Sequence, residues 1–180
     1  LILLAPTVEQ AINDLQNGYE ISTFIGLSLP NGLTINQTSS GYSFGPNIGV
    51  RFDTPIEFKL AKINSKIGLE IYFSSLLPKD NAWGFFSTNI IGNISLFPFY
   101  NKNQSISTIE IRPGIGFASA SINTNKDISL TFPVDIIYYM ELYRMKSAFK
   151  VQFQFNSGHP IGGSASLINL SYIIKTPFNF

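Results

Sequence analysis

The stretch YSFGPNIGVRFD, residues 42–53, decides the fold. Its even-numbered positions, from Tyr42 to Phe52, are all apolar, whereas its odd-numbered positions, from Ser43 to Asp53, are all small, polar or charged. Successive side chains of a β-strand leave opposite faces of the sheet, so an apolar period of two is typical of a strand. We therefore predict a strand here, with one wholly apolar face and one small or polar face.

The same alternation recurs along the chain and predicts an all-β fold. It is found in eight segments, at residues 20–29, 42–53, 66–74, 86–96, 109–118, 129–142, 149–156 and 168–175. Short connections rich in Pro, Gly, Asn and Lys separate them, which favours antiparallel neighbours in up-and-down order. Residues 54–65 alternate again after Pro55, and we expect a bend or bulge there. A few apolar side chains interrupt the polar face and are predicted to share its direction: Phe24, Tyr72, Ile91 and Tyr139.

Composition excludes several classes of function. The chain has 180 residues, no cysteine and one histidine, so a disulfide framework, a thiolate nucleophile, a zinc-thiolate site and a multi-histidine metal cage are ruled out. We expect no metal and no cofactor. Twelve basic residues against 11 acidic ones give no electrostatic footprint for nucleic acid. No window approaches the ~18 consecutive apolar residues of a membrane helix.

The position of the ionisable residues indicates that the apolar face meets lipid. All of those in the predicted strands lie on the face rich in Gly, Ser and Asn, including Lys66 and Lys175, and none interrupts the apolar face. Such a face suits a narrow interior, and eight strands can close into a barrel without a free edge. We predict an eight-stranded antiparallel transmembrane β-barrel. Its lumen is expected to hold a charge network, structural or pore-lining, of Glu20, Arg51, Asp53, Glu70, Glu110, Arg112, Asp135, Glu141 and Lys150.

Aromatic residues near the predicted strand ends favour the same surroundings. Transmembrane barrels carry aromatic girdles at both membrane interfaces. The candidates for these girdles are Tyr42, Trp83, Phe97, Tyr100, Tyr138 and Phe180.

Residues 1–17 differ from the rest of the chain. Thr7 followed by Gln10 fits a capping box, and apolar residues then recur at helical spacing until Gly18. We predict a leader or short amphipathic helix over residues 1–17 and a barrel over residues 18–180. The leader either packs on the barrel, occludes its lumen or contacts a partner.

From Gly18 to Phe180 the chain resembles the small bacterial outer-membrane β-barrels of the OmpA, OmpX and OmpW type. A terminal Phe180 after an alternating segment is similar to the signal that the barrel-assembly machinery reads in that class, although Pro177 departs from the usual uninterrupted last strand. The resemblance implies a bacterial outer-membrane location. It also implies contact with outer-membrane lipid and lipopolysaccharide, with the assembly machinery, and with an envelope protein as a further candidate partner.

Several functions remain open at this point. The leading prediction is a non-enzymatic barrel with a filled lumen and a structural, scaffold or envelope-integrity role. A narrow pore or conduit for small hydrophobic molecules is the first alternative. A lipid A-modifying enzyme is the second, but Ser157 precedes His159, whereas lipid A deacylases place the serine two residues after the histidine. A soluble lipocalin-like binder is the rival at the level of the fold, and it requires the apolar face to point inward.

Overall fold

The computed structural model describes residues 20–31, 42–61, 63–79, 84–97, 109–122, 125–142, 145–159 and 163–177. Every regular element among them is a β-strand. The strands are β1 (Glu20–Pro30), β2 (Tyr42–Ser43), β3 (Gly45–Leu60), β4 (Ile63–Pro78), β5 (Phe85–Phe97), β6 (Ile109–Ile122), β7 (Asn125–Leu142), β8 (Met145–His159) and β9 (Gly163–Pro177). The described residues contain no helix long and apolar enough to cross a membrane. The helix predicted over residues 1–17 lies outside the described residues.

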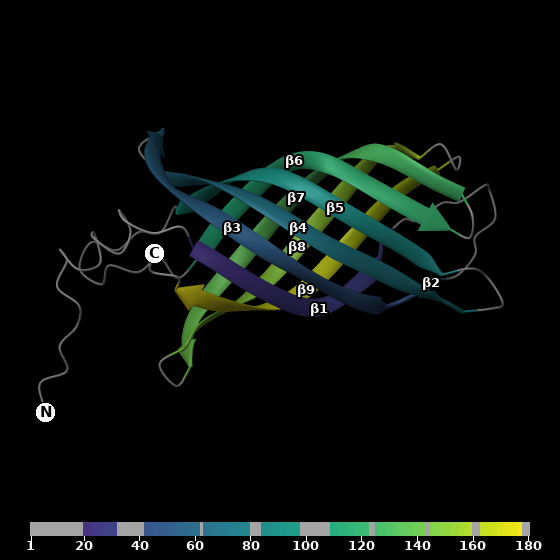
Figure 1. Cartoon of the computed structure of the whole chain (residues 1–180), viewed down its shortest axis with the longest axis horizontal. Coiled ribbons are helices and arrows are strands. Elements are labelled where there is room, and N and C mark those ends of the chain that lie inside the picture. The colour runs from purple at the N-terminus through teal and green to yellow at the C-terminus, as the bar shows by residue number, and fades with distance from the viewer. Residues whose placement is uncertain are drawn as a thin grey trace, which may run out of the picture.

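The strands form a closed antiparallel barrel (Figure 1). β2 and β3 pair one after the other with the same edge of β4 and together count as one strand of the barrel. The described strands therefore form an eight-stranded barrel. From β3 onward each strand pairs with the next one along the chain, β1 pairs with β3, and the β1–β9 ladder closes the ring. This confirms the all-β, eight-stranded, up-and-down barrel. We call the end where β1 begins and β9 ends the proximal end, at the left of Figure 1, and the other the distal end.

Two irregularities interrupt the ladder between the combined strand β2–β3 and β4. Ser43 faces Leu77 and Asn47 faces Ser74, so one extra residue is accommodated on the β2–β3 side. Asp53 faces Gly68 and Glu57 faces Lys66, so two further extra residues follow in β3. The second irregularity confirms the bulge expected within residues 54–65. The first was not expected, and because a one-residue shift exchanges the two faces of a strand, it alters where Tyr42 points.

Burial alternates along the strands and shows which face is inside. In β6 the Glu110 and Arg112 side chains are buried, whereas Ile115 and Phe117 are 57% and 59% exposed. The same division holds in β3, where Arg51 is buried and Ile48 is 55% exposed. The charged and small residues therefore point into the lumen and the apolar residues point outward, as predicted. A lipocalin-like arrangement, with the apolar face inside, is excluded for these strands.

Glycine allows the closing ladder between β1 and β9 to form at its observed spacing. A Cβ atom on Gly26 would overlap the backbone carbonyl oxygen of Leu170 in β9, which is part of the wall and cannot move aside alone. We expect Gly26→Ala to destabilise the barrel by about 1–3 kcal/mol, as overpacking generally does. The measurement is the urea midpoint of folding, followed by heat-modifiable gel mobility.

Gly92→Ala is the matched control for this prediction. Its Cβ atom would lie 3.9 Å from the Ile115 oxygen and so has room. Equal midpoints for the two variants would contradict a steric role for Gly26.

Candidate functional site: a charge-filled lumen

Four charged side chains form a closed ring of alternating charge near the proximal end of the lumen. Arg51 and Asp53 come from β3, and Glu110 and Arg112 come from β6. Arg51 Nε donates to Asp53 Oδ2 at 2.7 Å, and its Nη2 donates to Glu110 Oε1 at 3.0 Å and to Oε2 at 3.1 Å. Arg112 closes the ring, because its Nη2 bonds Asp53 Oδ1 and its Nε lies 3.0 Å from Glu110 Oε1. We call these four residues the charge ring.

Two hydroxyl groups add hydrogen bonds to the charge ring. Ser95 Oγ accepts from Arg112 Nε at 3.0 Å and from Nη2 at 2.5 Å. The Tyr139 hydroxyl accepts from Arg51 Nη1 at 3.2 Å and donates to Glu110 Oε2. These contacts bring β5 and β7 into the same layer, so the charge ring connects facing parts of the wall.

The charge ring is electrically neutral and almost fully removed from solvent. Its four side chains are at most 3% exposed. Charges taken out of water are tolerated only when each is paired and hydrogen-bonded, which this geometry provides. Each guanidinium group contacts two carboxylates at once, because it is planar and carries several N–H donors. A lysine ammonium is a single point charge and does not offer this geometry.

A second cluster lies further along the lumen around Lys150 of β8. Its Nζ lies 2.5 Å from Glu70 Oε1 and 3.9 Å from Asp135 Oδ2, and Gln152 Nε2 donates to Glu70 Oε1 at 3.2 Å. The same ammonium sits over the ring of Phe24, 3.6 Å from its centroid. The Lys150 charge is therefore held by a carboxylate and by an aromatic face together.

Amide side chains fill the next layer toward the distal end. The Tyr72 hydroxyl donates to Gln154 Oε1 at 2.9 Å, and Gln154 Nε2 donates to Asn89 Oδ1 at 2.9 Å. Asn169 Nδ2 donates to Gln152 Oε1 at 2.6 Å. These bonds connect β4, β5, β8 and β9 across the interior. The polar layer therefore links β8 to β4 and β5, which are not its neighbours in the sheet.

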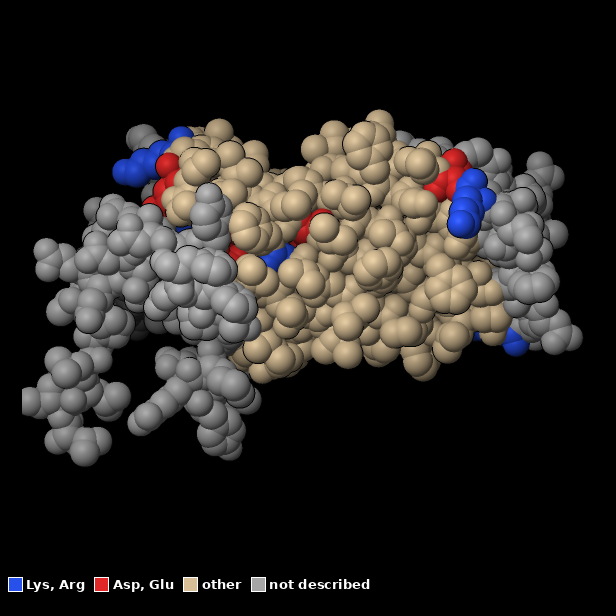
Figure 2. All heavy atoms as spheres, in the orientation of Figure 1, with Lys and Arg blue, Asp and Glu red and all other residues tan. Residues whose placement is uncertain are grey.

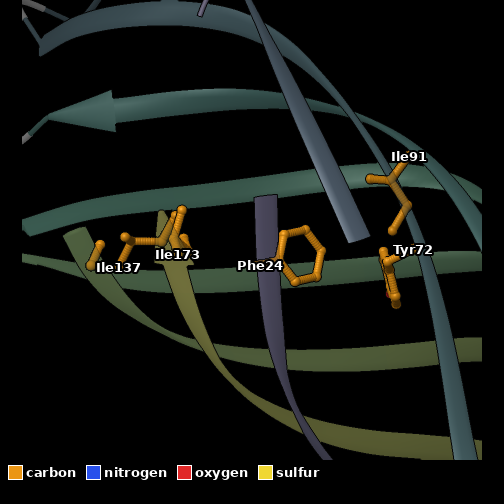
Figure 3. Packing of buried hydrophobic residues seen from close by; sticks show 6 residues of the cluster. Phe24, Tyr72, Ile91, Ile137 and Ile173 are labelled. Atoms are coloured by element: carbon orange, nitrogen blue, oxygen red, sulfur yellow. The ribbon is translucent and has the colours of Figure 1, made fainter. Parts of the chain in front are cut away.

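Two apolar clusters complete the filling. The mid-lumen cluster packs beside the Lys150 layer and consists of Phe24, Tyr72, Ile91, Ile137, Ala148 and Ile173, with Tyr139 against it (Figure 3). Phe24 and Tyr72 approach with ring centroids 6.1 Å apart. The distal cluster lies where the strands reach the other end and consists of Tyr42, Leu76, Phe85, Ala120 and Leu167. All members of both named sets except Tyr139 are buried.

The outer surface is the reverse of this interior. Figure 2 shows a broad uncharged middle, with Lys, Arg, Asp and Glu gathered mainly at the two ends and a little charge recessed among the uncharged atoms. Large apolar side chains are exposed on the strands all around the barrel. A protein in water does not keep so extended an apolar surface uncovered, whereas hydrocarbon requires it together with a closed ladder. This is the surface of a membrane-spanning barrel.

The structure places most of the predicted lumen charges together. The buried ones are Arg51, Asp53, Glu70, Glu110, Arg112, Asp135 and Lys150. Glu20 is half-buried at the proximal start of β1. The side chains of Glu141, Lys175 and His159 lie outside the described residues, although the backbones of all three belong to strands. Lys66 is buried and pairs with the more exposed Glu57 at 3.5 Å.

The predicted interface aromatics divide into three groups. Tyr138 is exposed on the outer face, as a girdle residue should be. The prediction for Tyr42 is wrong, because the extra residue between Ser43 and Asn47 turns its side chain into the distal cluster. Phe97 is half-buried and continues the inward-facing alternation of Asn93 and Ser95, so it does not lie on the outer face. Trp83, Tyr100 and Phe180 lie outside the described residues.

Several lumen residues were missed by the sequence pattern. Ile137, Ile173, Leu167 and Phe85 are buried inside although they are apolar. Their positions share the parity of inward polar neighbours, as Ile137 does with Asp135, so the alternation itself contained the signal. Neither the Tyr139 hydroxyl nor Ser95 was expected in the charge ring. Within the described residues, no three His, Cys, Asp or Glu side chains are grouped to hold a metal ion.

The backbone of this chain is similar to those of solved outer membrane proteins. No family model matches the chain, and no curated protein matches it. Among solved structures, it is similar to the crystal structure of Ail, the attachment invasion locus protein of Yersinia pestis, with 11% identity, 89% of this chain and 99% of that one covered, and a TM-score of 0.47. The backbone structure of the Yersinia pestis outer membrane protein Ail in a phospholipid bilayer nanodisc has 7% identity, with 87% of this chain and 99% of that one covered and a TM-score of 0.46. The crystal structure of the outer membrane protein OprG from Pseudomonas aeruginosa has 9% identity, with 89% of this chain and 94% of that one covered and a TM-score of 0.41.

Proposed function

We propose that this protein is a sealed, non-enzymatic β-barrel of the bacterial outer membrane, with a structural or scaffold role in the envelope. The filled lumen is the observation that supports it. The charge ring, the Lys150 cluster with the mid-lumen cluster beside it, and the distal cluster together occupy the interior, and their side chains are almost entirely buried. A barrel of eight strands has an interior just wide enough for side chains to fill.

Planar-bilayer recording tests the seal. We expect the inserted wild-type barrel to show no stepwise conductance. The control variant carries alanine in place of Arg51, Glu110, Glu70, Lys150, Tyr72 and Phe85, which removes large side chains from every filled part of the lumen in charge-neutral pairs while leaving the neutral pair of Asp53 and Arg112. This variant is expected to conduct. Discrete openings of the wild-type barrel would overturn the proposed seal.

A conduit for small hydrophobic molecules is the second candidate, because the mid-lumen cluster offers apolar contacts inside an otherwise polar channel. Phenylnaphthylamine fluorescence in detergent-free vesicles tests it. Saturable binding that is lost in Ile91→Glu would favour the conduit, and a response equal to that of empty vesicles would favour the seal. For a lipid A-modifying enzyme, unaltered acyl chains after incubation of the barrel with lipopolysaccharide are the expected result.

Outer-membrane lipid, including lipopolysaccharide, is the proposed partner of the outer apolar band, and the barrel-assembly machinery is the proposed partner of Phe180. Deleting Phe180 is expected to lower the folded amount in cells severalfold. Refolding of the purified variant into vesicles should stay unchanged, since all of the described β1–β9 pairs, from Glu20–Pro177 to Pro30–Leu167, remain present. The measurement is the heat-modifiable band in membrane extracts against that of refolded protein. An equal loss in both settings would contradict a recognition role.

A further inference from the structure

One hairpin of the wall extends past its neighbour at the proximal end. The β1–β3 ladder stops at the pair of Glu20 and Asp53 among the described residues, but β3 runs on to Leu60. Its continuation pairs with β4 alone, from Glu57–Lys66 to Leu60–Ile63. Figure 1 shows this part rising away from the barrel at the upper left. We call the described residues 54–61 and 63–66 the overhanging hairpin.

The overhanging hairpin has two chemically different faces. Ile56 and Leu60 are 59% and 48% exposed and continue the outward row of β3 that contains Ile48. Glu57 and Lys59 lie on the opposite face, where Lys66 pairs with Glu57. An apolar outer face and a charged inner face therefore persist along β3 past the end of β1, with the buried Lys66 side chain still at the end of the lumen.

The apolar row is longer than a membrane requires. From Phe44 to Leu60 it covers 17 residues, Phe44 before β3 and the whole of β3, and only Thr54 interrupts it. At ~3.3 Å per residue and a tilt of ~40°, this is roughly 40 Å along the barrel axis, against an apolar band of about 25 Å in transmembrane barrels. A row that starts in the band at its distal end therefore leaves it near the bulge after Asp53, and the side chains beyond need another apolar environment.

We infer that the overhanging hairpin lies in the interfacial layer of the lipid leaflet at the proximal end. Ile56 and Leu60 then contact the acyl-chain boundary, and Lys59 lies at the level of the lipid phosphates. This inference rests on the proposed membrane location. Lipid is the occupant because the outer face of the hairpin is continuous with the lipid-facing band, and because Lys59 on the opposite face can extend its ammonium to the lipid phosphates.

Tryptophan quenching by brominated lipid tests the inference. The full-length chain carries Trp83→Phe, so that each further variant has a single tryptophan at a chosen position. The probe positions are Ile56→Trp and Leu60→Trp. Ile48→Trp on the wall and Lys59→Trp on the opposite hairpin face are the controls. Each variant is refolded into phosphatidylcholine and phosphatidylglycerol vesicles whose acyl chains carry bromine close to the headgroup or close to the chain end.

The two hypotheses predict different results. If the hairpin binds lipid, Ile56→Trp and Leu60→Trp are quenched at least twofold more by bromine close to the headgroup than Lys59→Trp is, and their emission is blue-shifted. If both emit as in water while Ile48→Trp is quenched, the hairpin stands clear of the membrane and the inference is overturned. If Ile48→Trp is also unquenched in folded protein, the proposed membrane location itself is wrong.

Discussion

Glu110→Gln is expected to lower the free energy of unfolding by about 3–5 kcal/mol, the usual cost of stranding a buried charge. Both Glu110 carboxylate oxygens accept from Arg51 Nη2, and Glu110 Oε1 lies 3.0 Å from Arg112 Nε. Without its charge, two buried guanidinium groups share the single carboxylate of Asp53. Bulk water does not reach these side chains to replace the lost charge, because they are at most 3% exposed. Urea-dependent unfolding from vesicles measures the change.

Glu57→Gln is the matched control, since it makes the same chemical change at an ion pair whose carboxylate side chain is 44% exposed. Lys66 is buried, so this variant also removes the partner of a cation, but water reaches the pair from the Glu57 side and the loss of stability should be clearly smaller than for Glu110→Gln. Similar losses for Glu57→Gln and Glu110→Gln would show that the charge ring does not stabilise the barrel.

A double variant separates lost charge balance from lost contacts. Glu110→Gln combined with Arg112→Met removes one charge of each sign and leaves Arg51 paired with Asp53 at 2.7 Å. We expect the double variant to be more stable than Glu110→Gln alone, because no uncompensated cation remains. A loss equal to the sum of the two single losses would contradict this.

Ile115→Arg is expected to destabilise the barrel in vesicles by about 2–4 kcal/mol, the cost of a cation at the middle of the lipid-facing wall. Ile115 lies at the middle of β6 with its side chain on the outer face. The cost arises only if hydrocarbon surrounds that face, since an arginine on a surface bathed by water is nearly neutral in effect. Folding into vesicles along a urea gradient measures it.

Ile128→Arg is the depth control. Ile128 is also exposed on the outer face, but it lies near the distal start of β7, where a cation costs about 0–1 kcal/mol. Equal, small effects at Ile115 and Ile128 would place water around the whole wall and would remove the basis for a membrane-spanning barrel.

Much of the fold could be predicted from alternation, because a strand with a period of two assigns every side chain to one face. Residues 42–53 specify which groups of β3 are enclosed, except at Tyr42. That exception has a physical cause, since one extra residue near Phe44 exchanges the faces, and no feature of composition marks it. Similarly, Phe97 belongs to the inward row, although it is an aromatic residue near a strand end.

The partners within the lumen could not be predicted. The alternation places Arg51 and Glu110 inside, but their contact joins β3 to β6 across 59 residues. Which inward side chains meet depends on the stagger of all the strands between them, and so on register shifts such as the one between Asp53 and Glu57. The Tyr139 hydroxyl enters the same layer for this reason, whereas its sequence position suggested only an apolar side chain.

The ladder between Glu20–Pro30 and Gly163–Pro177 has a consequence for the order of events in biogenesis. These are the strands farthest apart in sequence, and a chain that lacks the later one leaves two open edges. Such long-range pairing is slow, because the chain loses much conformational entropy before the contacts between these two strands form and stabilise it. We therefore expect the nascent protein to stay open until synthesis has passed β9, and truncation within that strand to yield material for degradation rather than a smaller barrel.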